Sequence, residues 1–275
     1  MTHPVDSSPL GQKTAYVSTY DASLLFPIAR RESRKVLGLV DRLPFYGLDI
    51  WTGYELSWLN SKGKPEVAVA EFSIPFDSPN IIESKSFKLY LNSFNQTKFT
   101  TLDDVKELLV TDLSAVAGAA VSVSLHPLHN SNLLIDFTFD ALCIDGLDIS
   151  VDTYHPRQEF LAADKAVNVS ETLCSHLLKS NCPVTGQPDW ASVFIEYTGA
   201  KINHENLLRY VISFREHQDF HEHCVERIFT DILHQCQPTS LSVYARYTRR
   251  GGLDINPFRS TEKGSVPKVG RLLRQ

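Results

Sequence analysis

The sequence of 275 residues lacks long apolar runs, a cysteine framework and a strong net charge. No stretch approaches the roughly 18 to 20 apolar residues that a membrane-spanning helix needs, and the N-terminus lacks the basic start and apolar core of a signal peptide. The five cysteines are an odd number and widely scattered, which favours reduced thiols in the cytoplasm over disulfides. A net charge of −5 argues against a nucleic-acid surface. We therefore expect a cytoplasmic globular protein that binds neither membrane nor nucleic acid directly.

Three common nucleotide and catalytic motifs are also absent from the sequence. No GxGxxG pattern lies between a predicted strand and a predicted helix, so nothing supports a Rossmann dinucleotide site. Neither a P-loop nor a GxSxG nucleophile elbow occurs. Any nucleotide or nucleophile must therefore be held by another arrangement.

What the chain does contain is an alternation of strands and helices that occurs twice. Apolar residues at every second position predict strands at residues 84–92, 119–125, 132–140, 167–178, 206–214 and 240–248. Helical spacing predicts helices at residues 101–116 and 219–236, the first capped by Thr101. At a shift of 120 residues, VKELLVTDL matches VERIFTDIL and YLNSF matches YVISF, which suggests an internal duplication.

These elements predict an α+β fold of two tandem modules, each an antiparallel sheet with helices packed on one face. The predicted modules cover residues 46–150 and 165–258. Residues 1–45 carry little periodicity and are expected to form an N-terminal arm with turns. Residues 259–275 are rich in Lys and Arg, and a basic, solvated C-terminal tail is expected there.

The segment KSNCPVTGQPDW, residues 179–190, places a thiol in a loop. Cys182 lies between an asparagine and a proline, which favours a partly exposed, reactive cysteine over one packed inside an element. Asp189 follows seven residues later and suits proton delivery to a substrate atom, although a turn residue after Pro188 is its ordinary interpretation.

The segment DFHEHC, residues 219–224, allows three interpretations. Asp219 and Glu222 fit the N-cap and N3 positions of the predicted helix. His221 and Cys224 have a spacing that zinc ligands use, with Cys182 as a third ligand, but no full ligand set is apparent, so no metal is predicted. The third interpretation makes His221 an acid–base group and Glu222 a carboxylate that binds the N–H edge of a heterocycle.

Two further segments carry basic residues. IIESKSFKLY, residues 81–90, has the spacing of an ordinary solvent-facing strand. YTRRGGLDINPFR, residues 247–259, places two arginines before two glycines, a pattern that suits either an exposed turn or the binding of a phosphate by guanidinium and close backbone.

Taken together, ESKSFKLY, SNCPVTGQPDW, FHE and YTRRGGLDINP resemble the NADPH-dependent 7-cyano-7-deazaguanine (preQ0) reductases, the nitrile reductases of queuosine biosynthesis. The resemblance covers residues 45–258 and is to the long, two-module form, which implies the tunnelling fold, NADPH as the cofactor and a homodimer. ESKSFKLY is similar to the signature that separates these enzymes from the related GTP cyclohydrolase I group.

The resemblance also implies roles for residues of this sequence. Cys182 would attack the nitrile carbon, Asp189 would protonate the nitrogen, and His221 would assist proton transfer. The implied substrate-binding residues are Glu83, Ser84, Lys85, Phe220, His221 and Glu222. The implied cofactor-binding residues are Lys85, Ser86, Arg250 and Gly251. The alternatives are a zinc-dependent cyclohydrolase-like enzyme that uses Cys182, His221 and Cys224, and a purine-binding module without turnover.

Overall fold

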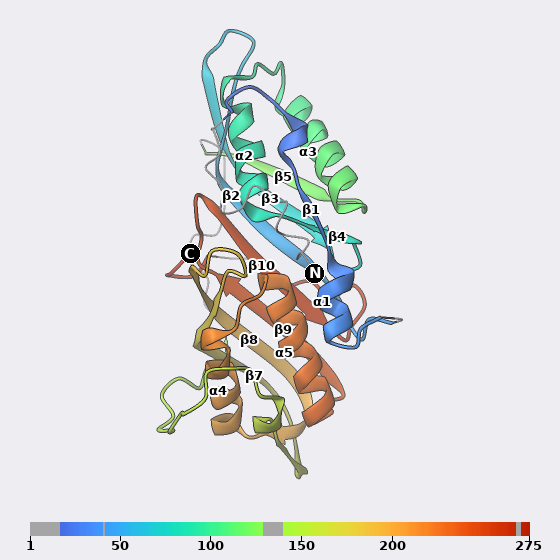
Figure 1. The fold of residues 1–275 in the computed structure, drawn as a ribbon, viewed down its shortest axis with the longest axis vertical. Coiled ribbons are helices and arrows are strands. Elements are labelled where there is room, and N and C mark those ends of the chain that lie inside the picture. The colour runs from blue at the N-terminus through green and yellow to red at the C-terminus, as the bar shows by residue number, and fades with distance from the viewer. Residues whose placement is uncertain (1–16, 41, 129–139, 268–270) are drawn as a thin grey trace. The chain divides into compact units, whose positions relative to one another are not determined.

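The structure is a computed structural model that describes residues 17–40, 42–128, 140–267 and 271–275 (Figure 1). The chain divides into two compact units, and each is described by itself. The first unit contains residues 1–33, 49–134 and 249–254, and the second contains residues 34–48, 135–248 and 255–275. The boundary between the units falls inside β2 and β10, so both of these strands contribute residues to each unit.

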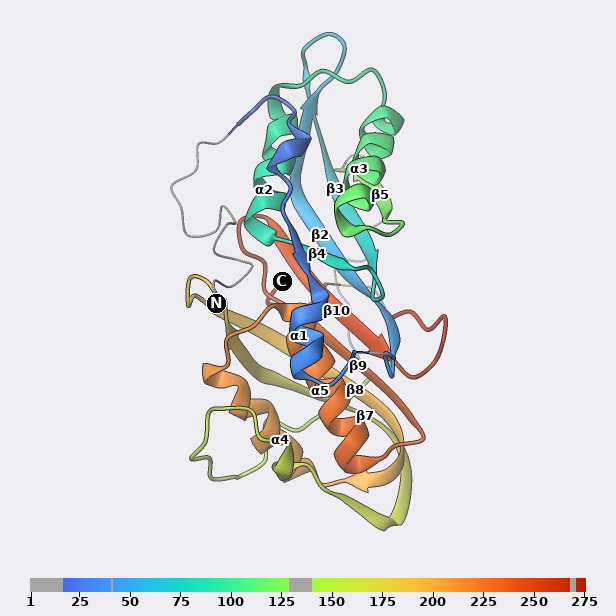
Figure 2. The ribbon, with the colours of Figure 1, turned by 45° about the vertical axis from the view of Figure 1, so that its right-hand side comes forward.

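The first unit is an antiparallel sheet, in the order β5-β3-β2, with helices on one face (Figure 2). A short additional pair joins β1 and β4. Its elements are β1 (Pro27–Ala29), β2 (Tyr46–Leu59), β3 (Pro65–Pro75), β4 (Asn80–Ile82), α2 (Ser84–Ser93), α3 (Leu102–Ala117) and β5 (Ser122–Pro127). Phe87 of α2 packs edge-on against Phe72 of β3, with ring centroids 4.9 Å apart, and this contact lies in the core of the unit.

The second unit carries a sheet in the order β10-β9-β8-β7-β6. All of its neighbouring strands run antiparallel except β6 and β7, which are parallel. Its elements are α1 (Arg30–Val36, which begins in the first unit), β6 (Leu142–Cys143), β7 (Ala163–Asn181), β8 (Pro188–Ile202), α4 (His204–Ser213), α5 (His221–Cys236), β9 (Ser240–Tyr247) and β10 (Leu253–Ser260). Helices α4 and α5 contact strands β7 and β9 of this sheet.

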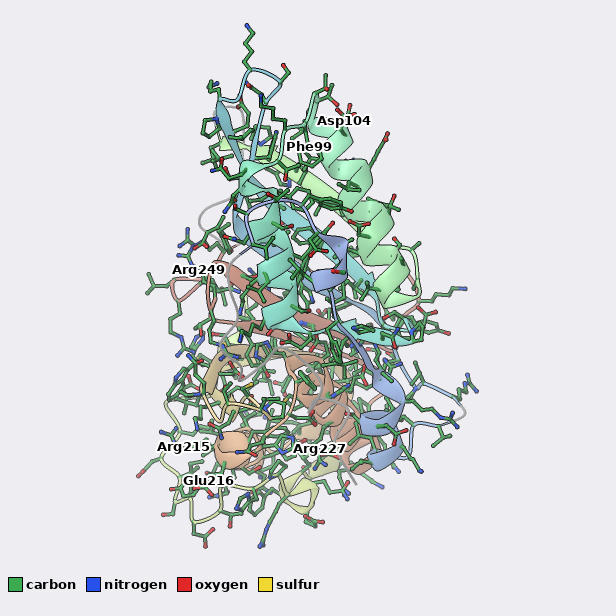
Figure 3. All side chains as sticks on the ribbon, turned by 45° about the horizontal axis from the view of Figure 1, so that its top comes forward. Phe99, Asp104, Arg215, Glu216, Arg227 and Arg249 are labelled. Carbon is green, nitrogen blue, oxygen red and sulfur yellow. The ribbon has the colours of Figure 1, made fainter. Side chains whose placement is uncertain are left out.

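The predicted α+β fold of two tandem modules, each with helices on one face of an antiparallel sheet, is confirmed. Helix α3 begins where the sequence predicted, because Thr101 and Asp104 form a reciprocal capping box at its start (Asp104 is labelled in Figure 3). The strands predicted around residues 119–125, 167–178 and 240–248 and the helix around 219–236 are also present. The strand predicted at 132–140 lies almost entirely outside the described residues.

Two predicted strands are helices. Residues 84–92 and 206–214 lie in α2 and α4. Apolar residues at 87, 89 and 91 fit an alternation, whereas those at 87, 90, 91 and 94 fit a helical period, so the segment satisfies both patterns and the alternation misled the prediction. The side chain of Glu83 decides the conformation, since it accepts hydrogen bonds from the backbone N–H groups of Lys85 and Ser86 and so caps α2.

The suggested internal duplication has a structural counterpart, but the shift of 120 residues holds for only one of the two helix pairs. Helices α2 and α4 each have 10 residues and lie 120 residues apart, whereas α3 and α5 each have 16 residues and lie 119 apart. In each unit the tyrosine of the shorter helix donates to an aspartate of the longer one: Tyr90 to Asp112 and Tyr210 to Asp231, both at 2.6 Å.

The ends of the chain are more ordered than the sequence suggested. Residues 27–36 of the predicted arm form β1 and α1. The prediction of a solvated tail from residue 259 is wrong at Arg259, because β10 continues to Ser260. Arg259 is fully buried, and its guanidinium pairs with Glu226 at 2.8 Å. Gln275 is also buried, and its side chain donates to Asn256 and to the carbonyl of Tyr247. Within the described residues, no helix is long and apolar enough to cross a membrane.

Candidate active site

Cys182 lies at the tip of the hairpin that joins β7 to β8 in the second unit. Ser180 pairs with Asp189, and Asn181 pairs with Pro188, so the six residues between Cys182 and Asp189 fold back on themselves. The loop is closed by the N–H of Cys182, which donates to Gln187 O at 2.9 Å, and by the N–H of Gly186, which donates to Cys182 O at 3.0 Å. The expected exposure is wrong, because Cys182 is only 6% exposed.

Asp189 and His221 form a buried pair in the same unit. Asp189 Oδ2 lies 3.2 Å from His221 Nε2, and both residues are less than a tenth exposed. The imidazole of His221 stacks on the ring of Tyr247, with centroids 3.8 Å apart and planes 5° apart. Its other nitrogen, Nδ1, is buried and has no hydrogen-bond partner within the described residues. A carboxylate and an imidazole in this contact can pass a proton, and one imidazole nitrogen remains for a further partner.

The segment before α5, residues 217–219, pairs with the end of β7 next to the cysteine loop. The N–H of Asn181 donates to His217 O at 2.8 Å, and the N–H of Asp219 donates to Asn181 O at 3.2 Å. Asp219 accepts from the N–H of Phe220 at 2.8 Å and lies 3.0 Å from His223 Nδ1. Burial alone would raise the pKa of Asp219, but the nearby imidazoles of His217 and His223 outweigh it and hold that pKa well below its usual range.

The predicted capping roles of Asp219 and Glu222 are wrong. Helix α5 has Phe220 as its N-cap residue, without a side-chain hydrogen bond, so Glu222 occupies the second helical position. The ring of Phe220 meets His223 edge-on, at 5.7 Å between centroids. Glu222 is 2% exposed, and a carboxylate so deeply buried at the positive end of a helix is a candidate for binding a polar ligand edge.

The motif ESKSFKLY places its first residues at the start of α2 in the first unit. Glu83 is fully buried, and burial raises the pKa of its carboxyl group despite hydrogen bonds from the backbone of Lys85 and Ser86. The Ser86 hydroxyl donates to Glu83 O at 2.7 Å and accepts from the N–H of Phe26 at 3.0 Å. This hydroxyl thereby fastens the start of α2, and its role toward a cofactor stays a prediction. Ser84 and Lys85 are half-buried at the same helix end.

The two glycines after Arg250 form a two-residue hairpin turn, also in the first unit. Arg250 and Leu253 pair across the turn, and Gly251 and Gly252 have φ values of +57° and +69°. Such a turn requires positive φ at both central residues, which explains the two glycines. A Cβ on Gly251 would lie 3.3 Å from the side chain of Lys88, so the turn abuts α2. Arg249 lies over the ring of Tyr54 at 4.7 Å (Figure 3).

The structure thus sorts the predicted site residues into two groups. Cys182, Asp189, Phe220, His221 and Glu222 lie together in the second unit, at the β7–β8 hairpin and the start of α5. The remaining predicted residues lie in the first unit, where the start of α2 and the turn after Arg250 are neighbours: Glu83, Ser84, Lys85, Ser86, Arg250 and Gly251.

Nothing in the sequence indicated that Tyr247 stacks on His221, and the structure disfavours the zinc site considered as an alternative. Tyr247 lies 26 residues from His221 along the chain, and no periodic signal connects a ring on β9 to an imidazole on α5. Among the described residues, Cys182, His221 and Cys224 do not form a group close enough to hold a metal ion.

This fold and this site define a class: an α+β protein of two sheet-and-helix modules with a buried cysteine close to a carboxylate–imidazole pair. The family model described as nitrile reductase, 7-cyano-7-deazaguanine-reductase N-term, matches residues 16–125, and the model described as QueF-like protein matches residues 188–265.

Curated relatives match almost the whole chain. NADPH-dependent 7-cyano-7-deazaguanine reductases from Burkholderia multivorans and Burkholderia ambifaria are each 58% identical over 271 residues, which is 98% of this chain and 99% of theirs. The chain therefore belongs to the NADPH-dependent 7-cyano-7-deazaguanine reductase family. A solved structure, that of the archaeosine synthase QueF-Like in the apo form, has 22% identity and a TM-score of 0.31 and covers 36% of this chain and 96% of its own.

Proposed function

We propose that this chain reduces the nitrile of 7-cyano-7-deazaguanine to the aminomethyl group with NADPH, through a covalent thioimide at Cys182. The observation that supports this proposal is the β7–β8 hairpin, because Asp189 pairs with Ser180, two residues before Cys182, and also contacts His221. A nitrile is a poor hydride acceptor, and a thiol adduct presents a C=N bond that accepts hydride more readily.

The reaction balances in four steps. Cys182 Sγ forms a bond to the nitrile carbon, and one proton passes to the nitrile nitrogen, which gives the thioimide. A first hydride reduces that carbon, the C–S bond breaks, and the thiolate leaves an imine. A second hydride and a further proton give the primary amine. NADPH, when bound, supplies the two hydrides, since nitrile to amine is a four-electron reduction.

Asp189 and His221 are the proposed proton donors for these steps. Asp189 is buried beside the imidazole of His221, whose orientation is fixed by stacking on the ring of Tyr247. The pair can therefore deliver a proton without a rearrangement of its side chains. Phe220 and Glu222 are the proposed substrate-binding residues of the same unit: a half-buried ring suits packing on a deazapurine, and a buried carboxylate suits its N–H edge.

Residues of the first unit complete the proposed assignments. Glu83, Ser84 and Lys85 are the proposed substrate-binding residues of this unit. The glycines after Arg250 leave the turn without side chains, and the side chain of Lys88 lies next to Gly251. A lysine beside such a turn suits the phosphates of NADPH. Arg250, Gly251, Lys85 and Ser86 are the proposed cofactor-binding residues.

The stoichiometry of NADPH consumption tests the proposed function. We expect about two equivalents of NADPH to be oxidised for each nitrile converted to amine, from the electron count of the reaction. Absorbance of NADPH and chromatographic quantitation of the amine give the two numbers. One equivalent with release of an imine or aldehyde, or no oxidation at all, would contradict the proposed reaction.

The activity is expected to need no metal at Cys182, His221 or Cys224. Strong chelators should leave kcat and KM for the nitrile unchanged, because these three residues do not form a metal-binding group and hydride transfer to a thioimide needs no Lewis acid. The rate is measured before and after chelation and dialysis. Loss of activity that zinc restores would favour the cyclohydrolase-like alternative.

Arg250 is expected to act on the cofactor and not on the nitrile. Because a lost charge-assisted hydrogen bond costs about 1.5 to 3 kcal/mol, Arg250→Ala should raise the KM for NADPH roughly tenfold to a hundredfold. The KM for the nitrile and the formation of the Cys182 adduct should change little. Arg249→Ala, at the neighbouring exposed position, is the matched control. An unchanged KM for NADPH together with a blocked adduct would assign the turn to the substrate instead.

We also propose a homodimer and a cytoplasmic location. Among the described strands, β5 and β6 each pair with one neighbour only, and open sheet edges of this kind are sites of pairing between chains. Light scattering after size-exclusion chromatography measures the mass directly. A nucleophilic cysteine requires a compartment that keeps thiols reduced, which supports the cytoplasm.

A further inference from the structure

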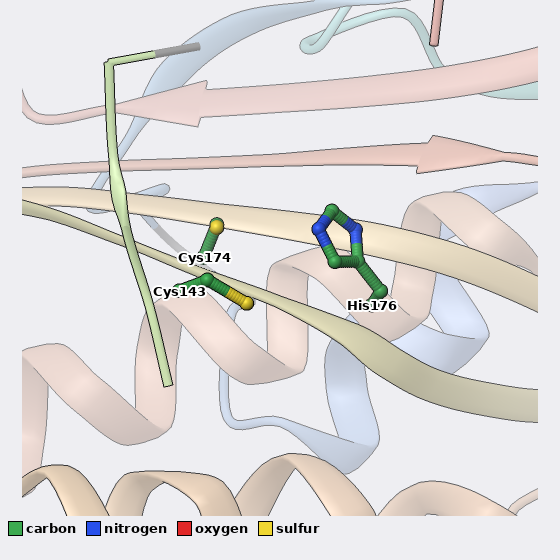
Figure 4. A group of neighbouring side chains, drawn as sticks. All are labelled: Cys143, Cys174 and His176. Atoms are coloured by element: carbon green, nitrogen blue, oxygen red, sulfur yellow. The ribbon is translucent and has the colours of Figure 1, made fainter. Parts of the chain in front are cut away.

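We propose that Cys143, Cys174 and His176 form a binding site for a zinc-class divalent cation in the second unit, separate from the residues of the proposed reaction. One ligand atom from each residue lies within 4.8 Å of the other two. Figure 4 shows the three side chains on neighbouring strands, with the imidazole of His176 turned toward the two cysteines. The sequence analysis predicted no metal, and this ligand set was not recognised there.

The strand pairing creates this group. Cys143 of β6 lies directly opposite Cys174 of β7 in the parallel ladder. Cys174 and His176 are two residues apart on β7, where the pairing with β8 shifts its register between Ser175 and Leu178, and a ligand atom of each lies within 4.8 Å of the other. Two thiols and an imidazole therefore converge although 31 residues separate the two cysteines. Sequence spacing alone gave no metal motif for this reason.

The chemistry of the three ligands suits zinc. Zinc takes thiolate sulfur at about 2.3 Å and imidazole nitrogen at about 2.0 to 2.1 Å, so ligands of a tetrahedral ion lie about 3.3 to 3.8 Å apart. The observed limit of 4.8 Å means that each pair of ligand atoms would have to approach by at most about 1.0 to 1.5 Å. Two thiolates and a neutral imidazole balance the charge of a divalent ion. The fourth position would be taken by water.

The surroundings of His176 provide a second observation. His176 Nδ1 lies 2.8 Å from Ser192 Oγ, so Nε2 remains for a metal. Metal-binding histidines are commonly held in this way, with the second ring nitrogen fixed by a neighbouring polar group. The backbone N–H of His176 donates to Asp145 Oδ2 at 2.9 Å, while Asp145 Oδ1 is buried and has no hydrogen-bond partner within the described residues. A carboxylate oxygen without a partner, two residues after Cys143, fits a water bound to the cation.

A cation at this place would fasten β6 to β7. Strand β6 has two residues, Cys143 is exposed, and the next residue, Ile144, donates its N–H to Cys174 O at 2.9 Å. Such a short strand has few contacts of its own to hold it, and three metal–ligand bonds across the ladder would add to them. None of Cys143, Cys174 and His176 belongs to the proposed catalytic group.

Zinc content of the full-length protein tests this proposal. The reduced protein is loaded with zinc and dialysed against metal-free buffer, and the metal is quantified by elemental mass spectrometry. We expect about one zinc per chain. Cys143→Ser and His176→Gln should each lose the zinc, and Cys182→Ala should retain it. In the cobalt-loaded protein, a thiolate-to-metal charge-transfer band should be present, and it should be absent in Cys143→Ser.

A further variant separates ligation from a purely structural role. Ser192→Ala should weaken zinc binding about 10-fold to 100-fold in competition with a chromophoric chelator, because it frees the imidazole that Ser192 orients. Nitrile reduction by Cys143→Ser should match that of the unmodified chain. A failure of the zinc proposal can therefore be told apart from a failure of the proposed function. No zinc in the reduced protein, a Cys143–Cys174 disulfide that survives reduction, or loss of zinc from Cys182→Ala would overturn the proposal.

Discussion

Cys182→Ala abolishes nitrile reduction, with an expected fall in kcat on the order of 10⁴-fold or more, the scale seen when a covalent nucleophile is removed. The physical reason is that alanine offers no atom to add to the nitrile carbon, so the C≡N bond must accept hydride directly. NADPH oxidation in the presence of the nitrile measures the effect. The affinity for the nitrile should change little, because the substitution removes one sulfur and leaves the hairpin intact.

Two controls keep this prediction specific. Cys182→Ser puts a hydroxyl group in place of the thiol and keeps a side chain of similar size. This variant should also be inactive, because an unactivated hydroxyl is a far weaker nucleophile than a thiolate. Thermal unfolding of both variants should stay close to that of the unmodified chain, since the hydrogen bonds that close the loop use backbone atoms of Cys182. Substantial turnover by a folded Cys182→Ala protein would remove the cysteine from the mechanism.

Asp189→Asn is expected to lower kcat about 10²-fold to 10⁴-fold, the usual contribution of a positioned proton donor. Asparagine has the same shape and can still hydrogen-bond to His221 Nε2, which lies 3.2 Å from the carboxylate, so the loss comes from the proton and not from the packing. Single-turnover kinetics should show slow adduct formation, while equilibrium binding of the nitrile is retained.

Glu196→Gln is the matched control for Asp189→Asn, because Glu196 is an exposed carboxylate on the same strand, β8. Its kcat should match that of the unmodified chain. Equal rates for Asp189→Asn and the unmodified chain would show that the proton comes from elsewhere, and His221→Gln would then be the next variant to measure.

Much of the fold followed from local patterns that determine their own structure. The helix at α3 was predictable because the apolar period and the capping residues around Thr101 agree. Helix α2 was not predictable from period alone, because its apolar residues satisfy both a helical and an alternating pattern. The side chain that resolves the ambiguity, Glu83, was interpreted as a ligand of the substrate and not as a cap.

The residues of the candidate site were predictable from the sequence, but their burial and their contacts were not. The loop residues around Cys182 correctly predicted a turn, but the exposure of a turn depends on the segments that pack near it. His217, 36 residues from Asn181 along the chain, accepts a hydrogen bond from the Asn181 N–H next to Cys182. The stack of His221 on Tyr247 depends on sheet order, which local spacing does not encode. Arg259 was assigned to solvent because charge is usually exposed, whereas its partner Glu226 lies on a helix distant in sequence.

The covalent intermediate is tested most directly by the intact mass of the protein mixed with the nitrile in the absence of NADPH. The account predicts a mass increase equal to the whole substrate, located on the peptide that contains Cys182 and absent from Cys182→Ala. Addition of NADPH should return the protein to its original mass and release the amine. An unmodified Cys182 under saturating nitrile, or an adduct that persists in Cys182→Ala, would contradict the thioimide mechanism.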